Sequence, residues 1–160
     1  MSGRIVVGVD GSATGDAALD WAAGEALVRD AALEVVHAEW ARRVFLDGYR
    51  GLERAEEELL ERSVRRARSV APGITVSGTL YDPPAAPALL RAARGADLLV
   101  VGSRGGGPVR EVTMGSVSNE CVHRASCPVV IVPIEREVAH SEHRAGQGVR
   151  ARQAEENPGG

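Results

Sequence analysis

The sequence predicts an α/β fold: a single doubly wound domain in which a five-stranded parallel sheet has helices on both faces. Five short apolar runs, rich in Val and Ile, have the length and composition of buried strands. Segments with helical periodicity separate these runs, and this alternation is typical of parallel sheets. The chain has 160 residues, which suits about one domain. Right-handed crossovers then restrict the topology to a few doubly wound orders.

A strand and a helix open the chain. Residues 4–9 are short, apolar and β-branched, as in a buried strand. The turn after them places Ser12 or Thr14 where a hydroxyl can cap a helix over about residues 14–29. One side of this helix is apolar and is formed by Leu19, Ala22, Ala23, Ala26 and Leu27.

A second strand and a long helix come next. Residues 33–38 are an apolar run, and residues 41–50 have the composition of a mobile connection. Residues 52–70 follow a helical period, with an inner stripe of Leu52, Ala55, Leu59, Ser63, Ala67 and Val70. The outer face pairs Glu58 with Arg62 and Glu61 with Arg65. We interpret this face as solvated, because the alternating charges cancel.

The second half of the chain alternates three more strands with two helices. Pro72 and Gly73 end the long helix, and strands are predicted at 74–79, 97–101 and 127–133. Helices are predicted over about 85–94, with Leu89 and Leu90 inward and Gly95 as C-cap, and over 116–124. The predicted folded domain is 1–134, and residues 135–160 are expected to be a disordered polar tail.

Composition excludes several classes of function. A net charge of −3 argues against nucleic acid and against membrane surfaces as partners, and no apolar run is long enough to span a membrane. The N-terminus has no apolar signal segment, so we expect a cytoplasmic protein. All 19 basic residues are arginines, which excludes a Walker A lysine and a Schiff-base lysine. Cys121 and Cys127 match no common metal motif, and we expect reduced, partly buried thiols.

A glycine-rich segment is the main candidate for chemistry. Gly102, Gly105 and Gly115 follow an apolar strand and precede a helix start at Ser116. Glycines allow close approach of an anion to backbone N–H groups, and the amides of Ser116 and Val117 at a helix N-terminus favour negative charge. Arg104 can add positive charge in place of the missing lysine. The alternative is a flexible connection, and neither G-x-G-x-x-G nor G-x4-G-K-[ST] is present.

The turn after the first strand is the second candidate. In a doubly wound sheet of order 3-2-1-4-5, this turn and the glycine segment meet where the strand order reverses. Asp10 there can accept hydrogen bonds from ribose hydroxyls, or it can simply be a turn or cap residue. His37 and Ala38 end the second strand at the same edge. Ala38 can offer its backbone to an adenine edge, and His37 is interpreted as structural or next to the purine rather than as a base.

Four segments together resemble the universal stress protein family. They are Val6-Val-Gly-Val-Asp-Gly-Ser12, Val36-His-Ala38, Val101-Gly-Ser-Arg-Gly105 with Gly115-Ser-Val-Ser118, and Ala125-Ser-Cys-Pro-Val-Val-Ile-Val-Pro133. The spacing G-x2-G-x9-G-[ST] is similar to the signature of that family's ATP-binding branch. The resemblance covers residues 3–134 and implies the strand order 3-2-1-4-5.

The resemblance also implies a ligand and an assembly. ATP would place its adenine near Gly8 and Ala38 and its ribose at Asp10. Its phosphates would lie on Val101, Gly102, Gly105, Gly115, Ser116 and Val117. A homodimer would form through the last strand, Val129–Pro133. The implied function is a stress-response regulator with little or no hydrolysis; a slow metal-dependent ATPase using Mg²⁺ and a nucleotide-free interaction protein remain alternatives.

Overall fold

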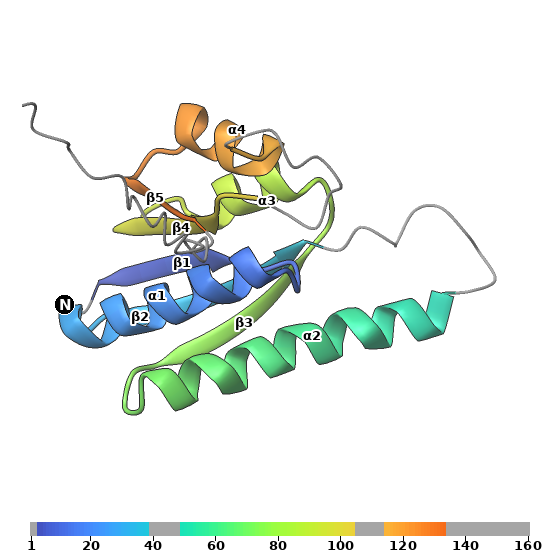
Figure 1. Ribbon diagram of the computed structural model, residues 1–160, viewed down its shortest axis with the longest axis horizontal. Coiled ribbons are helices and arrows are strands. Elements are labelled where there is room, and N and C mark those ends of the chain that lie inside the picture. Colours follow the sequence, from blue (N-terminus) through green and yellow to red (C-terminus); the bar gives the residue numbers. More distant parts are fainter. Residues whose placement is uncertain (1–2, 39–48, 105–113, 134–160) are drawn as a thin grey trace, which may run out of the picture.

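Strands and helices alternate along the described part of the chain, which is residues 3–38, 49–104 and 114–133 of a computed structural model (Figure 1). The strands are β1 (Arg4–Gly8), β2 (Ala32–Ala38), β3 (Val76–Tyr81), β4 (Leu98–Gly102) and β5 (Val129–Val132). The helices are α1 (Ala13–Arg29), α2 (Tyr49–Val70), α3 (Ala85–Ala92) and α4 (Ser116–Arg124). The predicted tail at 135–160 and most of the predicted connection at 41–50 lie outside the described residues.

The strands form one parallel sheet in the order β3-β2-β1-β4-β5, which confirms the predicted fold class. The chain builds outward from β1 to β3 and then returns to the middle to add β4 and β5 on the other side. The order therefore reverses between β1 and β4. Ligands of doubly wound sheets bind at this point, beyond the carboxyl ends of the strands.

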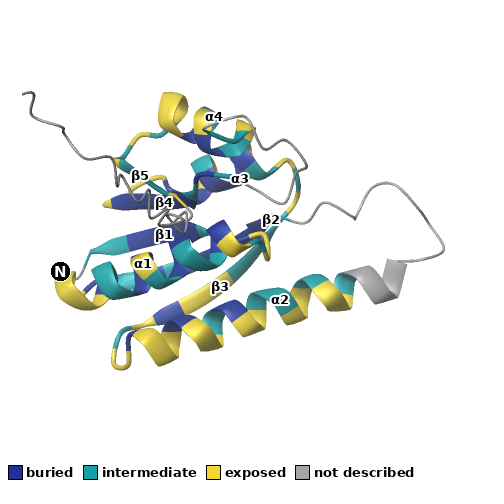
Figure 2. Cartoon of the chain, viewed as in Figure 1, coloured by how far each residue is buried: buried dark blue, intermediate teal, exposed yellow. Residues whose placement is uncertain are grey.

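Two hydrophobic clusters, one on each face, hold the layers together. Ile5 and Val7 of β1 face a cluster that includes residues of α1 and α2. Val6, between them in sequence, faces the opposite cluster with residues of α3 and α4. Figure 2 shows buried residues concentrated in the central strands and along the inward sides of the helices. Burying each large aliphatic side chain contributes about 1.5–3 kcal/mol, so these clusters are the main source of stability.

The start of α1 and the end of α3 refine the sequence prediction. Ser12 is the N-cap of α1, where its side chain accepts a hydrogen bond from the Gly15 N–H. Thr14 lies inside the helix and does not cap it. α3 ends at Ala92 rather than at 94, and Ala93 is its C-cap; Gly95 lies beyond in the left-handed region, with φ of 71°.

The third strand lies two residues further along than predicted, at Val76–Tyr81 rather than 74–79. The turn after α2 passes through Gly73 at φ of 99°, and Ile74 then packs into the core before strand pairing begins at Val76. α2 also begins earlier than predicted, at Tyr49, so the last two residues of the predicted connection are helical.

The inward face of α2 is rotated from the predicted stripe. Leu59, Ser63 and Ala67 face the core as predicted. Ala55 is exposed and Val70 is 40% exposed, because Leu60 and Val64 pack against the core in their place. The side chain of Leu52 lies outside the described residues. On α1, Leu27 is likewise exposed, against the prediction.

On the outer face of α2, Glu61 and Arg65 form the predicted ion pair at 3.5 Å, whereas Glu58 contacts Arg54 at 3.4 Å. A bidentate ion pair ties α2 to α1. The Nε and Nη2 atoms of Arg66 each lie 2.6 Å from a carboxylate oxygen of Asp20.

Within the described residues, no helix is both long and apolar enough to cross a membrane.

Candidate functional site at the switch point

The turn after β1 is held by its own side chains. The Asp10 carboxylate accepts hydrogen bonds from the Ser12 N–H, at 3.0 Å, and from the Ser12 hydroxyl. Gly11 between them adopts a φ of 79°, which glycine reaches without steric cost. Asp10 therefore has the turn role that the sequence left open, while its side chain lies at the exposed end of the strand.

The two ends of the glycine segment, which runs from Gly102 to Gly115, meet at the Ser103 carbonyl; we call this meeting point the base of the segment. The Gly115 N–H donates to the Ser103 carbonyl at 2.7 Å, and the Ser118 hydroxyl approaches the same oxygen at 3.3 Å. Ser103 in turn donates its N–H to the Val132 carbonyl of β5 at 2.8 Å. Gly105 lies outside the described residues, so the site is described from the residues on either side.

The two glycines that flank this base serve different purposes. A Cβ on Gly102 would lie 2.8 Å from the backbone carbon and oxygen of Thr14, closer than real contacts allow. A Cβ on Gly115 would meet nothing nearer than 3.4 Å, and its φ of −73° suits any residue. Packing therefore explains the glycine at 102 with or without a ligand, whereas it does not require one at 115.

Helix α4 begins directly after Gly115. This N-cap residue has no side chain to occupy the first amides of the helix. Ser116 is exposed and Val117 is half-buried against the α3–α4 side of the sheet. The N-terminus of α4 thus presents donors and a positive dipole end beside the base of the glycine segment.

The remaining predicted residues lie along the same edge of the sheet. Gly8 ends β1, and a Cβ there would lie 2.9 Å from the Leu89 methyl groups. Ala38 ends β2 and pairs with Tyr81 of β3. The side chain of Val101 is buried, so it can contribute only backbone atoms. Arg104 is half-buried at the end of β4.

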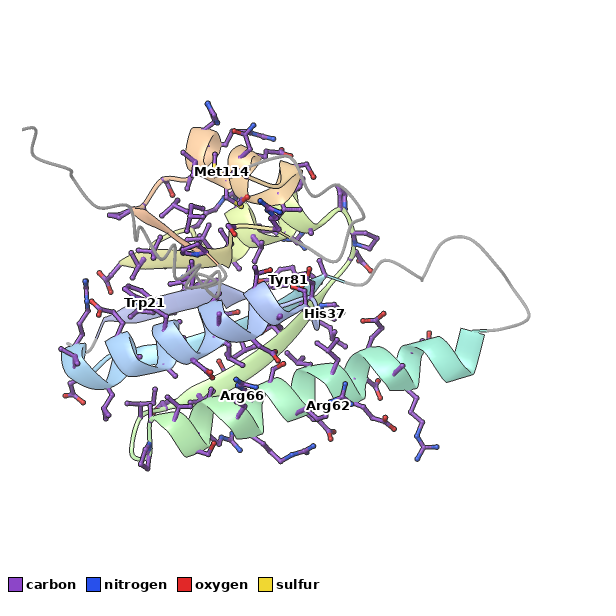
Figure 3. The ribbon with its side chains drawn as sticks, in the orientation of Figure 1. Trp21, His37, Arg62, Arg66, Tyr81 and Met114 are labelled. Atoms are coloured by element: carbon purple, nitrogen blue, oxygen red, sulfur yellow. The ribbon has the colours of Figure 1, made fainter. Side chains whose placement is uncertain are left out.

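His37 has partners that sequence reasoning did not find. The ring is buried, with Nδ1 2.8 Å from the Val9 carbonyl and Nε2 in contact with the Glu56 carboxyl group of α2. Figure 3 labels His37 and Tyr81 at the same end of the sheet. A carbonyl only accepts hydrogen bonds, so Nδ1 carries a proton. The hydrogen bond between Nε2 and the Glu56 carboxyl group needs a further proton, on one of these two groups. This pair joins α2 to the ends of β1 and β2, and it supports the structural interpretation of His37.

Sequence reasoning also missed the role of Thr14. Its hydroxyl donates to the Arg104 carbonyl, 90 residues later in the chain. The available signal was a threonine two residues after the N-cap Ser12, in the first turn of the helix. The partner of that hydroxyl could be found only from the three-dimensional structure.

The cysteines are free, as predicted, and are unsuited to nucleophilic chemistry. Burial raises the pKa of the Cys121 thiol to about 11, with smaller contributions from Glu120 and Cys127. Burial also raises the pKa of Cys127, against a lowering by Arg4. Thiolates are the reactive form, so both residues are poor nucleophiles at neutral pH. Within the described ranges, no three His, Cys, Asp or Glu side chains gather as a metal-binding group.

Comparisons with known proteins agree with this architecture. The family model described as the universal stress protein family matches residues 1–133. A universal stress protein of Mycolicibacterium smegmatis is 34% identical over 149 residues, which cover 85% of this chain and 50% of that relative. Universal stress protein Rv2005c of Mycobacterium tuberculosis is 31% identical over 139 residues, covering 80% of this chain and 47% of the relative. The chain thus spans about half the length of these relatives.

Solved structures show the same fold. The crystal structure of a universal stress protein in complex with cAMP is 26% identical, with a TM-score of 0.64, and the match covers 81% of this chain and 96% of that one. A universal stress protein from Archaeoglobus fulgidus in complex with dAMP is 24% identical, with a TM-score of 0.63 and coverage of 81% and 97%. On the family model and the relatives together, this chain belongs to the universal stress protein family.

Proposed function

We propose that this chain is a nucleotide-binding regulatory protein and that its ligand is ATP, with or without Mg²⁺. The observation that carries the proposal is the convergence at the switch point. The Asp10 turn, the base of the glycine segment and the N-terminus of α4 lie at one edge of the sheet. The relative solved with cAMP supports an adenine nucleotide as the ligand class.

Each part of ATP has a matching group in this proposal. Adenine lies against Gly8 and Ala38 at the ends of two neighbouring strands, and the second oxygen of the Asp10 carboxylate accepts from the ribose. The phosphates contact backbone donors and Arg104 through Val101, Gly102, Arg104, Gly105, Gly115, Ser116 and Val117. The Asp10 carboxylate also supplies an oxygen of the kind that Mg²⁺ prefers.

We propose binding with little or no hydrolysis. The chain has no lysine to neutralise charge on a transferred phosphate. The Asp10 carboxylate accepts from the Ser12 N–H and hydroxyl through one oxygen and, in this proposal, from the ribose through the other, so it is poorly placed to activate water. Occupancy of the site, rather than turnover, would then shift the populations of two states of the protein.

The proposed assembly is a homodimer through β5. This strand pairs with β4 on one side, and no strand in the described residues pairs with its other side. All four of its residues are half-buried, so a second copy would cover both backbone groups and apolar surface.

The direct test is mass spectrometry of small molecules released from freshly purified protein, followed by calorimetry with ATP. We expect Gly115→Val to abolish measurable ATP binding while the protein stays folded, because the new side chain occupies the phosphate position. Gly24→Val is the matched control, since a Cβ at Gly24 meets nothing within 4 Å. Circular dichroism of both variants checks the fold.

Three results would change the proposal. Unchanged ATP affinity in Gly115→Val would place the phosphates elsewhere. Sustained ATP hydrolysis above the Gly115→Val level would indicate a slow metal-dependent ATPase. A purified protein that is empty and does not respond to millimolar ATP would indicate a nucleotide-free interaction protein.

A further inference from the structure

We propose that Thr14 is a positioning residue for the phosphate side of the site: its hydroxyl links helix α1 to the end of β4 and fixes the position of the Arg104 carbonyl. This inference rests on the proposed nucleotide-binding function. It concerns a residue whose side chain need not touch the ligand.

The first observation is the unusual direction of the Thr14 hydroxyl. Thr14 lies in the first turn of α1 and is 2% exposed. Thr14 is the second residue of the helix, so no preceding helical turn offers its hydroxyl a carbonyl of the kind that threonines further inside helices use. The hydroxyl instead donates to the Arg104 carbonyl. This bond is partly buried, and a partly buried carbonyl that loses its donor is destabilised more than a fully solvated one.

The second observation is that packing brings the same two segments together. The backbone of Thr14 lies so close to Gly102 that a Cβ on Gly102 would be 2.8 Å from its carbon and oxygen atoms. The end of β4 thus lies against the first turn of α1, and the hydroxyl bond fixes the Arg104 carbonyl two residues after this contact. Backbone contact and side-chain bond constrain residues 102 to 104 from the α1 side.

Two further elements constrain the same residues from other directions. Ser103 donates to the Val132 carbonyl of β5 and accepts from Gly115 at the start of α4, at 2.8 and 2.7 Å. Ser103 is therefore fixed by β5 and α4, while Arg104 is fixed by Thr14. The contact from Thr14 is made by a side chain, so it can be changed without altering the backbone of the site; the Ser118 hydroxyl, at 3.3 Å from the Ser103 carbonyl, is a longer side-chain contact to the same stretch.

The neighbours of the Arg104 carbonyl explain why this bond would matter for an anion. The Gly115 N–H donates to the Ser103 carbonyl, and the N-terminus of α4 follows directly after Gly115. A β4 end that is held against α1 therefore keeps a fixed place beside the first amides of α4. These amides favour negative charge, so the anchored end of β4 and the start of α4 can face one phosphate group together.

Thr14 also connects the two halves of the proposed site. Its Oγ1 lies 3.1 Å from the Ser12 hydroxyl oxygen, and Ser12 contacts the Asp10 carboxylate. The Thr14 proton is used for the Arg104 carbonyl and the Ser12 proton for Asp10. The Ser12 and Thr14 oxygens are therefore in contact without a shared proton, and this row of side chains places the proposed ribose residue close to the start of the glycine segment.

The test compares Thr14→Val, which removes the hydroxyl at nearly constant shape, with Thr14→Ser, which keeps it; Thr14→Ala replaces the valine variant if that one does not fold. Ser63→Ala is the matched control, because it removes another buried helical hydroxyl, one that donates to the Leu59 carbonyl of its own helix. Calorimetry measures the affinity of each full-length variant for ATP and for adenosine.

We expect Thr14→Val to weaken ATP binding by about tenfold, the loss of roughly one well-placed hydrogen bond. Adenosine binding should change by less than about twofold, because adenosine lacks phosphates, and Thr14→Ser and Ser63→Ala should match the unmodified protein with both ligands. Equal losses for ATP and adenosine, or a serine variant as weak as the valine variant, would overturn the positioning role.

A second measurement needs no nucleotide. Amide hydrogen exchange at Ser103 and Gly115 should be faster in Thr14→Val than in the unmodified protein, Thr14→Ser or Ser63→Ala, because the end of β4 loses one of its constraints. Unchanged exchange would overturn the anchoring itself. If the unmodified protein binds no ATP, the proposed function fails, and the exchange rates alone decide whether Thr14 anchors β4.

Discussion

Gly102 and Gly115 flank the same segment, yet the structure requires a glycine only at the first of them. At Gly102 a side chain would meet the Thr14 backbone, which cannot move without shifting α1. At Gly115 a side chain would make ordinary contacts with Ser103 and Ser118. At the scale of single residues, substitutions at these two glycines can therefore separate an effect on the stability of the fold from an effect on ligand binding.

Gly102→Ala is predicted to destabilise the fold by about 1–3 kcal/mol, the usual cost of overpacking a tight contact. Gly115→Ala should cost less than about 0.5 kcal/mol, as substitutions away from packed features do. Urea denaturation of both variants measures the two free energies of unfolding. Similar losses at the two positions would contradict this division of roles.

Cys121 gives a prediction for alkaline pH. Its folded pKa is raised to about 11 by burial, whereas an unfolded cysteine titrates near about 8.5. Between these two pKa values the folded state binds the thiol proton more strongly than the unfolded state does. The stability that the neutral thiol contributes is therefore complete below about pH 8.5, and it falls as the pH rises toward 11. The slope from this group is at most about 1.4 kcal/mol per pH unit.

The matching experiment measures the free energy of unfolding from pH 8 to about pH 10.5 in the unmodified protein and in Cys121→Ala. The variant starts less stable because it loses buried volume, but its stability should decline less steeply with pH. Parallel curves would show that Cys121 does not contribute to the alkaline loss.

At the scale of elements, β5 combines a protected side with an unprotected one. The Pro128 carbonyl accepts from Leu99 and the Val132 carbonyl accepts from Ser103, so the even-numbered residues direct their backbone groups toward β4. Val129 and Ile131 direct theirs away from β4, because successive residues of a strand alternate. Among the described residues, no strand pairs with the outward N–H of Ile131.

Ile131→Pro is predicted to lower the dimer fraction, because proline removes this outward N–H while the bonds to β4 remain. Ile131→Val controls for the loss of side-chain volume and should dimerise like the unmodified protein. Analytical ultracentrifugation gives both fractions. A proline variant that dimerises normally would exclude this edge as the interface.

Much of the element scale could be predicted from sequence. Apolar runs and helical spacing located every described strand and helix, since burial on a sheet face and along a helix leaves a strong pattern. The two-residue error in β3 arose because Ile74 is apolar and partly buried but lies before the paired residues of the strand. The face of α2 was predicted with an error because Leu60 and Val64 satisfy the same spacing as the chosen stripe.

At the scale of the whole molecule, the sheet order explains which parts of the site were predictable. The reversal between β1 and β4 brings together the two segments that sequence patterns had already selected, Asp10 to Ser12 and the glycine segment. The contacts of Thr14 with Arg104 and of His37 with Glu56 were not predictable, because they depend on the packing distance between elements.

A chain ending at residue 134 is predicted to keep the proposed site. All described strands and helices lie within residues 3–133. ATP at about 100 times its dissociation constant should stabilise this shorter chain by about 2.7 kcal/mol, as it should the full chain, because a ligand that binds only the folded state stabilises it by mass action. Thermal melting with and without ATP compares the two chains. A smaller shift in the shorter chain would assign part of the binding to residues 135–160.

The hydrogen bond between Gly115 and Ser103 has a consequence for engineering. This bond holds the two ends of the intervening segment close together, and the contacts of Ser103 with β5 and of Gly115 with α4 keep these ends in place. Foreign peptides of different lengths could therefore be grafted between residues 104 and 114 while the scaffold keeps its shape. The fold would then be a scaffold for grafted binding loops, and libraries of such loops could be screened by display methods against chosen targets.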